Sequence, residues 1–330
     1  MKRAICTRLI AMATVAAAAF PAAAAISSNI QKNFSVAAGG KLIVDTDLGD
    51  VEVRTSPSNS VSVQVFREAR LADAKDAEKL FSKFHLKFEQ KGNDIEVRGD
   101  YEDQSFFHLF DNARLNVRFV ITVPSRYDVD VNTSGGDVSV ADLAGNVTIK
   151  TSGGDLKIGR IDGTVDAGTS GGDVVVNSGR NITVKSSGGD LSVGHAFGPI
   201  EARTSGGNIK IEQADGSLVA KTSGGTITLN QIAGAVDANT SGGSISARIT
   251  RQPNSNSSLS TSGGNVSVYL NEGIHLNLDA DTSGGRVSTE MPVAVQGSVD
   301  SSSLDAKLNG GGPALRVRAS GGNIVFHRAQ

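Results

Sequence analysis

The chain has 330 residues, of which 39 are glycine and 7 proline, and its formal net charge is −2. This is a globular composition without the basic footprint that phosphate binding requires, so we expect no nucleic-acid partner. Cys6 is the only cysteine, which excludes a disulfide framework, a zinc finger and a thiol enzyme.

Residues 1–25 have the pattern of a secretory signal peptide. Lys2 and Arg3 begin it, the apolar run 9–20 follows, and Ala23-Ala24-Ala25 offers a small-residue cleavage site. The apolar run is too short to span a bilayer comfortably, which disfavours an uncleaved membrane anchor, and no later stretch resembles a spanning helix. We therefore expect an exported protein with no integral membrane segment after cleavage, located in the periplasm, on the outer surface or outside the cell.

Residues 26–130 are expected to form N-terminal strands and a helical cap. The segment from Leu71 to Phe88 has helical spacing, which places Leu80, Phe81, Phe84 and Phe88 on one face. A cap is expected because the open end of a stacked β structure exposes apolar core and unpaired strand edges. Strand-like runs surround this segment at Leu42–Val44, Val51–Val53, Val61–Val65, Ile95–Val97 and Leu115–Val123.

A repeat occupies residues 131–330. The tripeptide Ser-Gly-Gly occurs ten times, with its serine at positions 134, 152, 170, 187, 205, 223, 241, 262, 283 and 320. Most intervals are 18 residues, and a fixed period of this size is typical of a stacked-repeat architecture. The last interval, of 37 residues, is about two periods, and Asp300–Leu304 near its middle is interpreted as a degraded copy. Leu48–Val51 resembles an earlier copy.

The positions of apolar residues within each repeat predict two short strands per coil. Counting from the serine, positions −5, −3, +4 and +6 are apolar, as in Ile200, Ala202, Ile209 and Ile211 around Ser205. Alternation with period two marks a strand with one buried face, and a third inward residue recurs at +9. Ser-Gly-Gly is expected at the corner between the strands, because glycine adopts positive φ without steric cost.

The predicted fold is therefore all-β: a single-stranded β-solenoid, or β-helix, of about 18-residue coils. Left-handed solenoids built on hexapeptides place inward residues every six positions, and this spacing differs. A right-handed or irregular solenoid is favoured.

Several features together resemble a known family. They are the signal peptide, the mixed N-terminal region, the passage Val120–Ser125 leading into Val129–Val131, and the reiterated Thr-Ser-Gly-Gly-Asp-Val coils. In these respects the chain resembles the bacterial family of exported β-strand-repeat proteins named putative adhesins, over about residues 35–330. The resemblance implies a β-helical fold and supplies no catalytic residues.

The residue after each Gly-Gly forms the candidate binding site. In four successive coils it is an aspartate, and in register these carboxylates form a ladder along one corner: Asp137, Asp155, Asp173 and Asp190. Carboxylates are ligands that Ca²⁺ prefers, so weak ligand or Ca²⁺ binding is one interpretation. Hydrogen bonding to nearby backbone groups within the corner is favoured over it. The threonine that precedes most of the serines is expected to form a matching ladder of hydrogen bonds.

Two other sites were weighed. Tyr101, Phe106, Phe107 and Phe110 could form an aromatic platform for sugars, although packing beneath the cap is the favoured interpretation. The five histidines have neither catalytic-triad spacing nor a metal-ligand pattern, so no resident metal or other cofactor is expected.

Three function classes follow. The first is an exported non-enzymatic solenoid that acts as an adhesin-like binding module or envelope scaffold, with an envelope polymer, glycan or protein as its partner. The second is a polysaccharide lyase or hydrolase, which needs carboxylates or a basic residue in a cleft, for example beside the loop 251–258. The third is a structural or sensory envelope component that binds another protein.

Overall fold

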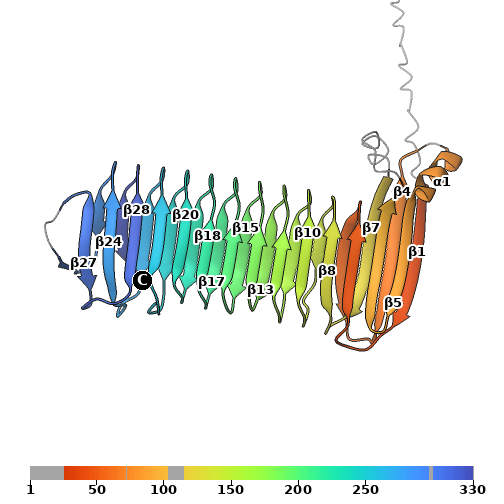
Figure 1. Cartoon of the computed structure of the whole chain (residues 1–330), viewed down its shortest axis with the longest axis horizontal. Coiled ribbons are helices and arrows are strands. Elements are labelled where there is room, and N and C mark those ends of the chain that lie inside the picture. The colour runs from red at the N-terminus through yellow and green to blue at the C-terminus, as the bar shows by residue number, and fades with distance from the viewer. Residues whose placement is uncertain (1–25, 72, 103–114, 297–299, 330) are drawn as a thin grey trace, which may run out of the picture.

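The computed structural model describes residues 26–71, 73–102, 115–296 and 300–329. The chain forms a long rod of two sheets, one of 14 strands (sheet A) and one of 15 strands (sheet B), whose inner faces share one apolar core (Figure 1). The predicted all-β solenoid is confirmed, because successive coils contribute one strand to each sheet and equivalent strands pair in parallel.

The middle of the rod is built from regular coils. In sheet B these strands are β8 (Asp128–Thr133), β10 (Val147–Thr151), β12 (Val165–Gly168), β14 (Ile182–Lys185), β16 (Ile200–Arg203), β18 (Leu218–Lys221), β20 (Val236–Thr240) and β22 (Ser257–Thr261). In sheet A they are β9 (Val138–Val140), β11 (Leu156–Arg160), β13 (Val174–Gly179), β15 (Leu191–Ala196), β17 (Ile209–Ala214), β19 (Ile227–Ile232), β21 (Ile245–Ile249) and β23 (Val266–Leu270).

The apolar positions read from the repeat are the buried positions of each coil. Around Ser205, the side chains of Ile200, Ala202, Ile209 and Ile211 are at most 2% exposed, and Ala214 at +9 is fully buried. Each lies against the equivalent residue of the neighbouring coil, as Ile209 does between Leu191 and Ile227. Burial of one such aliphatic side chain contributes about 1.5–3 kcal/mol, so the core stabilises the rod evenly along its length.

The first coil of the chain lies inside the N-terminal end of the rod, with two strands of sheet B and three strands of sheet A beyond it. The elements here are β1 (Ile26–Ser35), β2 (Lys41–Thr46), β3 (Asp50–Ser56), β4 (Ser60–Ala69), α1 (Ala74–Ser82), β5 (Phe84–Lys91), β6 (Asp94–Tyr101) and β7 (Leu115–Pro124). Strands β2 and β3 lie between β8 and β9 on one side and β6 and β7 on the other. Antiparallel β4 and β1 extend sheet A beyond β7, and antiparallel β5 extends sheet B beyond β6.

The predicted helix is shorter than its spacing indicated. Helix α1 ends at Ser82, and Phe84 and Phe88 belong to β5 instead of the helix face. Phe84, Leu86 and Phe88 also alternate with polar residues at period two, and pairing with β6 selects that period. The prediction of one helical face from Leu80 to Phe88 is therefore wrong beyond Phe81.

The last coil is inserted between two earlier ones. The elements are β24 (Leu276–Thr282), β25 (Val287–Thr289), β26 (Ala294–Val295), β27 (Ser303–Leu308), β28 (Ala314–Ala319) and β29 (Ile324–Arg328). Strand β28 pairs with β22 and β24, and β29 pairs with β23 and β25. The interpretation of Asp300–Leu304 as a degraded coil is wrong, because β27 pairs antiparallel with β24. This antiparallel strand belongs to the segment that leads the chain back from β24 to β28.

Two predictions about chain organisation stay predictions. The signal peptide at residues 1–25 lies outside the described residues. The division between residues 26–130 and 131–330 is likewise untested, although β2 and β3 of the first part stack directly on β8 and β9. Within the described part of the chain, no helix is long and apolar enough to cross a membrane.

Candidate functional site

The second glycine of each Ser-Gly-Gly lies in direct contact with the coil beside it. A Cβ atom at Gly225 would lie 1.9 Å from the carbonyl oxygen of Gly207, and one at Gly207 would lie 2.0 Å from that of Gly189. Positive φ is not the cause, since Gly136 is the one glycine of these triplets that has it. The expectation of a left-handed corner is therefore wrong for the other coils, where close stacking requires the glycine.

The threonine before each serine is buried and fastens neighbouring corners together. Thr222 donates its hydroxyl to the carbonyl oxygen of Gly207 (2.9 Å) and accepts the N–H of Gly225 in its own coil (3.3 Å). Equivalent bonds to the second glycine of a neighbouring coil are made by Thr169, Ser186, Thr204, Thr240, Thr261 and Thr282, the last of them to Gly322 of the inserted coil. The predicted threonine ladder exists, and all of these hydroxyls except that of Thr282 also accept the N–H of the second glycine in their own coil.

The predicted aspartate ladder also bonds to backbone. The Oδ1 atom of Asp137 accepts the N–H of Asp155, that of Asp155 accepts the N–H of Asp173, and that of Asp173 accepts the N–H of Asp190, over 2.7–2.9 Å. Asp50 begins this series and Asn208 continues it. One oxygen of each carboxylate is thus occupied by the corner.

Among the residues that the structure describes, no group of three or more histidine, cysteine, aspartate or glutamate side chains is placed to hold a metal ion. The observed bonds join each aspartate to the backbone of the next coil and not to groups within its own turn, so the interpretation as local turn chemistry is wrong. Binding of a ligand or of Ca²⁺ to Asp137, Asp155, Asp173 and Asp190 stays a prediction.

A shallow trough on the outer face of sheet A is the strongest candidate binding surface. Two adjoining depressions of about 390 and 530 Å³ meet at Asn177. They cross β3, β9, β11, β13 and β15, which are consecutive strands of the sheet. The trough is lined by Glu52, Arg54, Ser139, Ala141, Asp142, Lys157, Gly159, Arg160, Val175, Asn177, Ser178, His195 and Phe197, among others.

The hollow of the trough arises from one row of small side chains. Position +7 of each coil faces outward on sheet A, and in consecutive coils it is Ala141, Gly159, Asn177 and Gly194. A bulkier residue, Arg54, stands before this row in β3, and Glu212 stands after it in β17. A continuous floor along the rod axis therefore follows from the coil register.

An exposed aromatic ring stands at one end of the trough. Phe197 follows β15 and is 55% exposed, and its ring centroid lies 4.0 Å from that of His195. The Nε2 atom of His195 lies 2.9 Å from Oδ2 of Asp215, which fixes the imidazole beside the ring. Sequence reasoning missed Phe197, although it is the only aromatic residue between Tyr127 and Tyr269.

The charges of the trough are largely paired within the protein. Arg160 contacts Oδ2 of Asp142 through Nε (2.8 Å) and a terminal nitrogen (2.5 Å), and its backbone N–H bonds Oδ1. Hydrogen bonds from Arg54 and Arg118 lower the pKa of Glu52. The trough is thus polar but close to neutral.

A second cluster lies farther along the same face. Arg248 lies over the ring of Tyr269 at 5.2 Å, and Tyr269 stacks on His327 with centroids 4.7 Å apart and planes 17° apart. His327 Nδ1 lies 3.0 Å from a carboxylate oxygen of Glu290. These side chains cover one another, so they present less free surface than Phe197.

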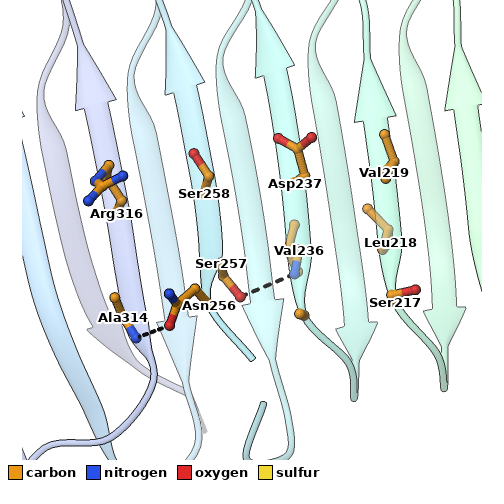
Figure 2. Close-up of a pocket in the computed structure, with 11 residues that line it drawn as sticks. Ser217, Leu218, Val219, Val236, Asp237, Asn256, Ser257, Ser258, Ala314 and Arg316 are labelled. Atoms are coloured by element: carbon orange, nitrogen blue, oxygen red, sulfur yellow. Dashed lines mark hydrogen bonds between the residues drawn. The ribbon is translucent and has the colours of Figure 1, made fainter. Parts of the chain in front are cut away.

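A smaller pocket of about 250 Å³ lies on sheet B, where Asp237, Ser258 and Arg316 stand in one row across adjacent strands (Figure 2). It opens where the 21-residue interval disturbs the pairing: Val236 N–H donates to Ser257 Oγ (3.1 Å) in place of a backbone oxygen. Lys221 pairs with Asp237 at 2.8 Å. Asp237 is the only carboxylate among the lining residues, so the loop 251–258 does not supply a pair of carboxylates here.

The residues weighed as an aromatic platform fall mostly in the segment 103–114. Phe106, Phe107 and Phe110 lie outside the described residues. Tyr101 is partly buried at the end of β6, where its ring centroid lies 6.4 Å from that of Phe84. Tyr101 thus packs against the core.

Comparisons with known proteins identify the family. The family model described as Toastrack DUF4097 matches residues 40–326. Solved structures similar to this chain include a putative adhesin from Bacteroides fragilis NCTC 9343 (14% identity, TM-score 0.36) and a putative lipid binding protein from Parabacteroides distasonis ATCC 8503 (14%, TM-score 0.39), each covering 92% of this chain and 97% of its own. No curated protein matches. The names of such distant structures do not transfer, but the family match covers most of the sequence, and the chain belongs to the Toastrack DUF4097 family.

Proposed function

We propose that the chain is a non-enzymatic, adhesin-like binding module of the bacterial envelope, which is exported and holds an extended partner against the outer face of sheet A. The trough across β3, β9, β11, β13 and β15 carries the proposal, because two depressions join there into one hollow along five consecutive strands. The corner hydrogen bonds fix each coil to its neighbours, so this surface is preorganised and loses little freedom on binding.

The electrostatics of the trough favour binding over acid–base catalysis. A glycoside hydrolase needs a general acid whose pKa is raised toward the working pH. Backbone and side-chain hydrogen bonds from Arg160 instead hold the pKa of Asp142 below its ordinary value, and the hydrogen bond with His195 lowers the pKa of Asp215. Both carboxylates therefore stay ionised at neutral pH, where they serve as hydrogen-bond acceptors.

The test measures binding and polymer length in the same samples. Protein expressed from the full-length sequence is mixed with acidic and neutral polysaccharides and with envelope extract, with and without Ca²⁺. We expect retention without shortening of any polymer. Shortened chains would contradict the non-enzymatic proposal, and retention only with Ca²⁺ would move the site from the trough to the aspartate ladder.

Cell fractionation tests the location. We expect the protein in the periplasmic, surface or culture fraction, with its N-terminus near Ile26 as the Ala23-Ala24-Ala25 cleavage site predicts. Recovery of the intact N-terminus in the cytoplasm would contradict export.

A further inference from the structure

We infer that the trough binds a neutral, extended polysaccharide, with the chain lying along the rod axis and one sugar ring stacked on Phe197. The inference rests on the proposed function and names the class of ligand that the same surface takes.

The direction of the trough and its period favour a linear polymer. The trough crosses five consecutive strands of sheet A from β3 to β15, and its floor of small residues, such as Ala141 and Gly159, runs through the last four of these coils. Neighbouring strands lie about 4.8 Å apart, which is close to the length of one hexose residue in an extended, β-1,4-linked chain. Each sugar unit of an extended polysaccharide would therefore contact an equivalent position in successive coils of the protein. A polysaccharide that adopts a helical shape would not stay in contact with the floor of the trough.

The exposed ring supplies the apolar part of sugar recognition. Phe197 is 55% exposed, and a phenyl ring has no polar atom that could gain from this exposure. A pyranose ring has an apolar C–H face, which covers an aromatic ring without loss of hydrogen bonds. The contact with His195 and the backbone bond from Phe197 N–H to the Gly179 carbonyl oxygen (3.0 Å) hold the ring in place.

The polar groups beside the ring fit hydroxyls. Asn177, Arg160 and Asp142 line the same depression as Phe197 and offer both donors and acceptors at its rim. Arg160 and Asp142 neutralise each other, so neither presents a full charge to a ligand. Over both depressions the charged lining residues are three cations (Arg54, Lys157 and Arg160) and two carboxylates (Glu52 and Asp142). A surface so close to neutrality favours an uncharged polysaccharide over a polyanion.

Affinity electrophoresis and calorimetry test the ligand class. Native gels contain hydroxyethylcellulose or galactomannan as neutral probes, and polygalacturonate as the acidic probe. Retardation by a neutral probe that persists at high salt is expected. Retardation only by polygalacturonate, and its loss at high salt, would overturn the inference.

Chain length tests the register of one sugar per coil. Affinity for cello- or manno-oligosaccharides is expected to rise with each added unit up to about five and then level off, because the trough crosses five strands. Malto-oligosaccharides, which curve, are the contrast. Equal affinity for a disaccharide and a hexasaccharide would contradict an extended site.

Variants test the residues. Phe197→Ala is expected to weaken binding of the neutral probe about three- to tenfold. Phe66→Ala removes the other exposed phenylalanine of sheet A (41% exposed), which lies on β4 outside the trough, and serves as the matched control. Ala141→Trp fills the floor without touching Phe197 and should also abolish the gain with chain length. Unfolding temperatures near that of the unmodified protein show that each variant is folded.

The outcomes separate this inference from the proposed function. If neutral probes bind but Phe197→Ala and Ala141→Trp have no effect, the trough is not their site and the inference fails. If no polysaccharide retards the protein and a protein from the extract is retained by it instead, the ligand class is wrong while a binding function stands. If a probe is shortened, the non-enzymatic function itself is wrong.

Discussion

Thr222 donates its hydroxyl hydrogen to the carbonyl oxygen of Gly207 in the neighbouring coil, over 2.9 Å. The same oxygen lies where any side chain at position 225 would have to stand. The carbonyl oxygen thus needs a hydroxyl at the threonine position and the absence of a side chain at the glycine position. Both residue types therefore recur with the coil period. The tripeptide that dominates the sequence is therefore a stacking device.

Removal of this hydroxyl should destabilise the rod. Thr222→Val keeps the volume of the side chain but removes the hydroxyl that bonds to the Gly207 carbonyl oxygen and the Gly225 N–H. We therefore expect a loss of about 1–3 kcal/mol in the free energy of unfolding. Denaturant unfolding measures this. Thr222→Ser should behave like the unmodified protein, since Ser186 makes the same bond. Equal stability of the valine variant would contradict the role of the hydroxyl.

The two glycines of one corner should respond oppositely to the same substitution. A Cβ at Gly154 would lie 1.9 Å from the Gly136 carbonyl oxygen, whereas one at Gly153 meets no atom within 4 Å. Gly154→Ala should cost at least about 1–3 kcal/mol, because the coils must separate. Gly153→Ala should be neutral or stabilise by up to about 1 kcal/mol, because alanine restricts the unfolded chain. Thermal unfolding of the pair gives the comparison.

The last coil lacks the corner hydroxyl, and supplying it should stabilise the protein. Ala319 stands in register between Thr261 and Thr282. Ala319→Thr would place a donor beside the Gly264 carbonyl oxygen and should raise the free energy of unfolding by about 0.5–1.5 kcal/mol. Ala319→Val adds similar volume without the hydroxyl and is the control. A valine variant as stable as the threonine variant would show that packing, not the bond, is responsible.

The insertion of the final coil predicts an unusual pattern of hydrogen exchange. β29 ends at Arg328, near the end of the chain, yet it pairs with β23 on one side and β25 on the other. Its amides should exchange as slowly as those of β19 in the middle of the rod, because opening them requires both neighbours to separate. The amides of β25, which forms the edge of sheet A, should exchange faster. Rapid exchange throughout β29 would show that the terminal coil frays.

Acid should weaken one contact at the entrance of the trough. Hydrogen bonds from Arg54 and Arg118 lower the pKa of Glu52 from its ordinary value of 4.5. Because the pKa is lower in the folded than in the unfolded chain, the contribution to stability is present above pH 4.5 and is lost as the pH falls through the folded value. Glu52→Gln should reduce stability by about 0.2–1 kcal/mol at pH 7, and the difference should vanish in strong acid. Denaturant titrations at several pH values measure it, and a constant difference would contradict the assignment.

The sequence by itself determined the coil. Alternation at period two assigns each apolar residue to the core, as with Ile209 and Ile211, and the recurrence of Ser-Gly-Gly sets the register between coils. From that register the outward row Ala141, Gly159, Asn177 and Gly194 follows as well, so the floor of the trough was within reach of the sequence. The aspartates form a ladder of identical residues, whereas the floor residues share only a lack of bulk, which is a weaker signal in the sequence.

Only the tertiary structure decided the order of the coils at the two ends. Equivalent coils present similar strand edges, so β28 and β29 can pair with any coil that is free on that side, and sequence distance does not select the partner. The spacing of the apolar residues at Phe84 and Phe88 fits both a helix and a strand. The segment is a strand because it pairs with β6, which the spacing does not reveal. The trough became a candidate site only when the structure placed Phe197 beside Asn177 and Arg160, because adjacency between coils comes from stacking and not from proximity along the chain.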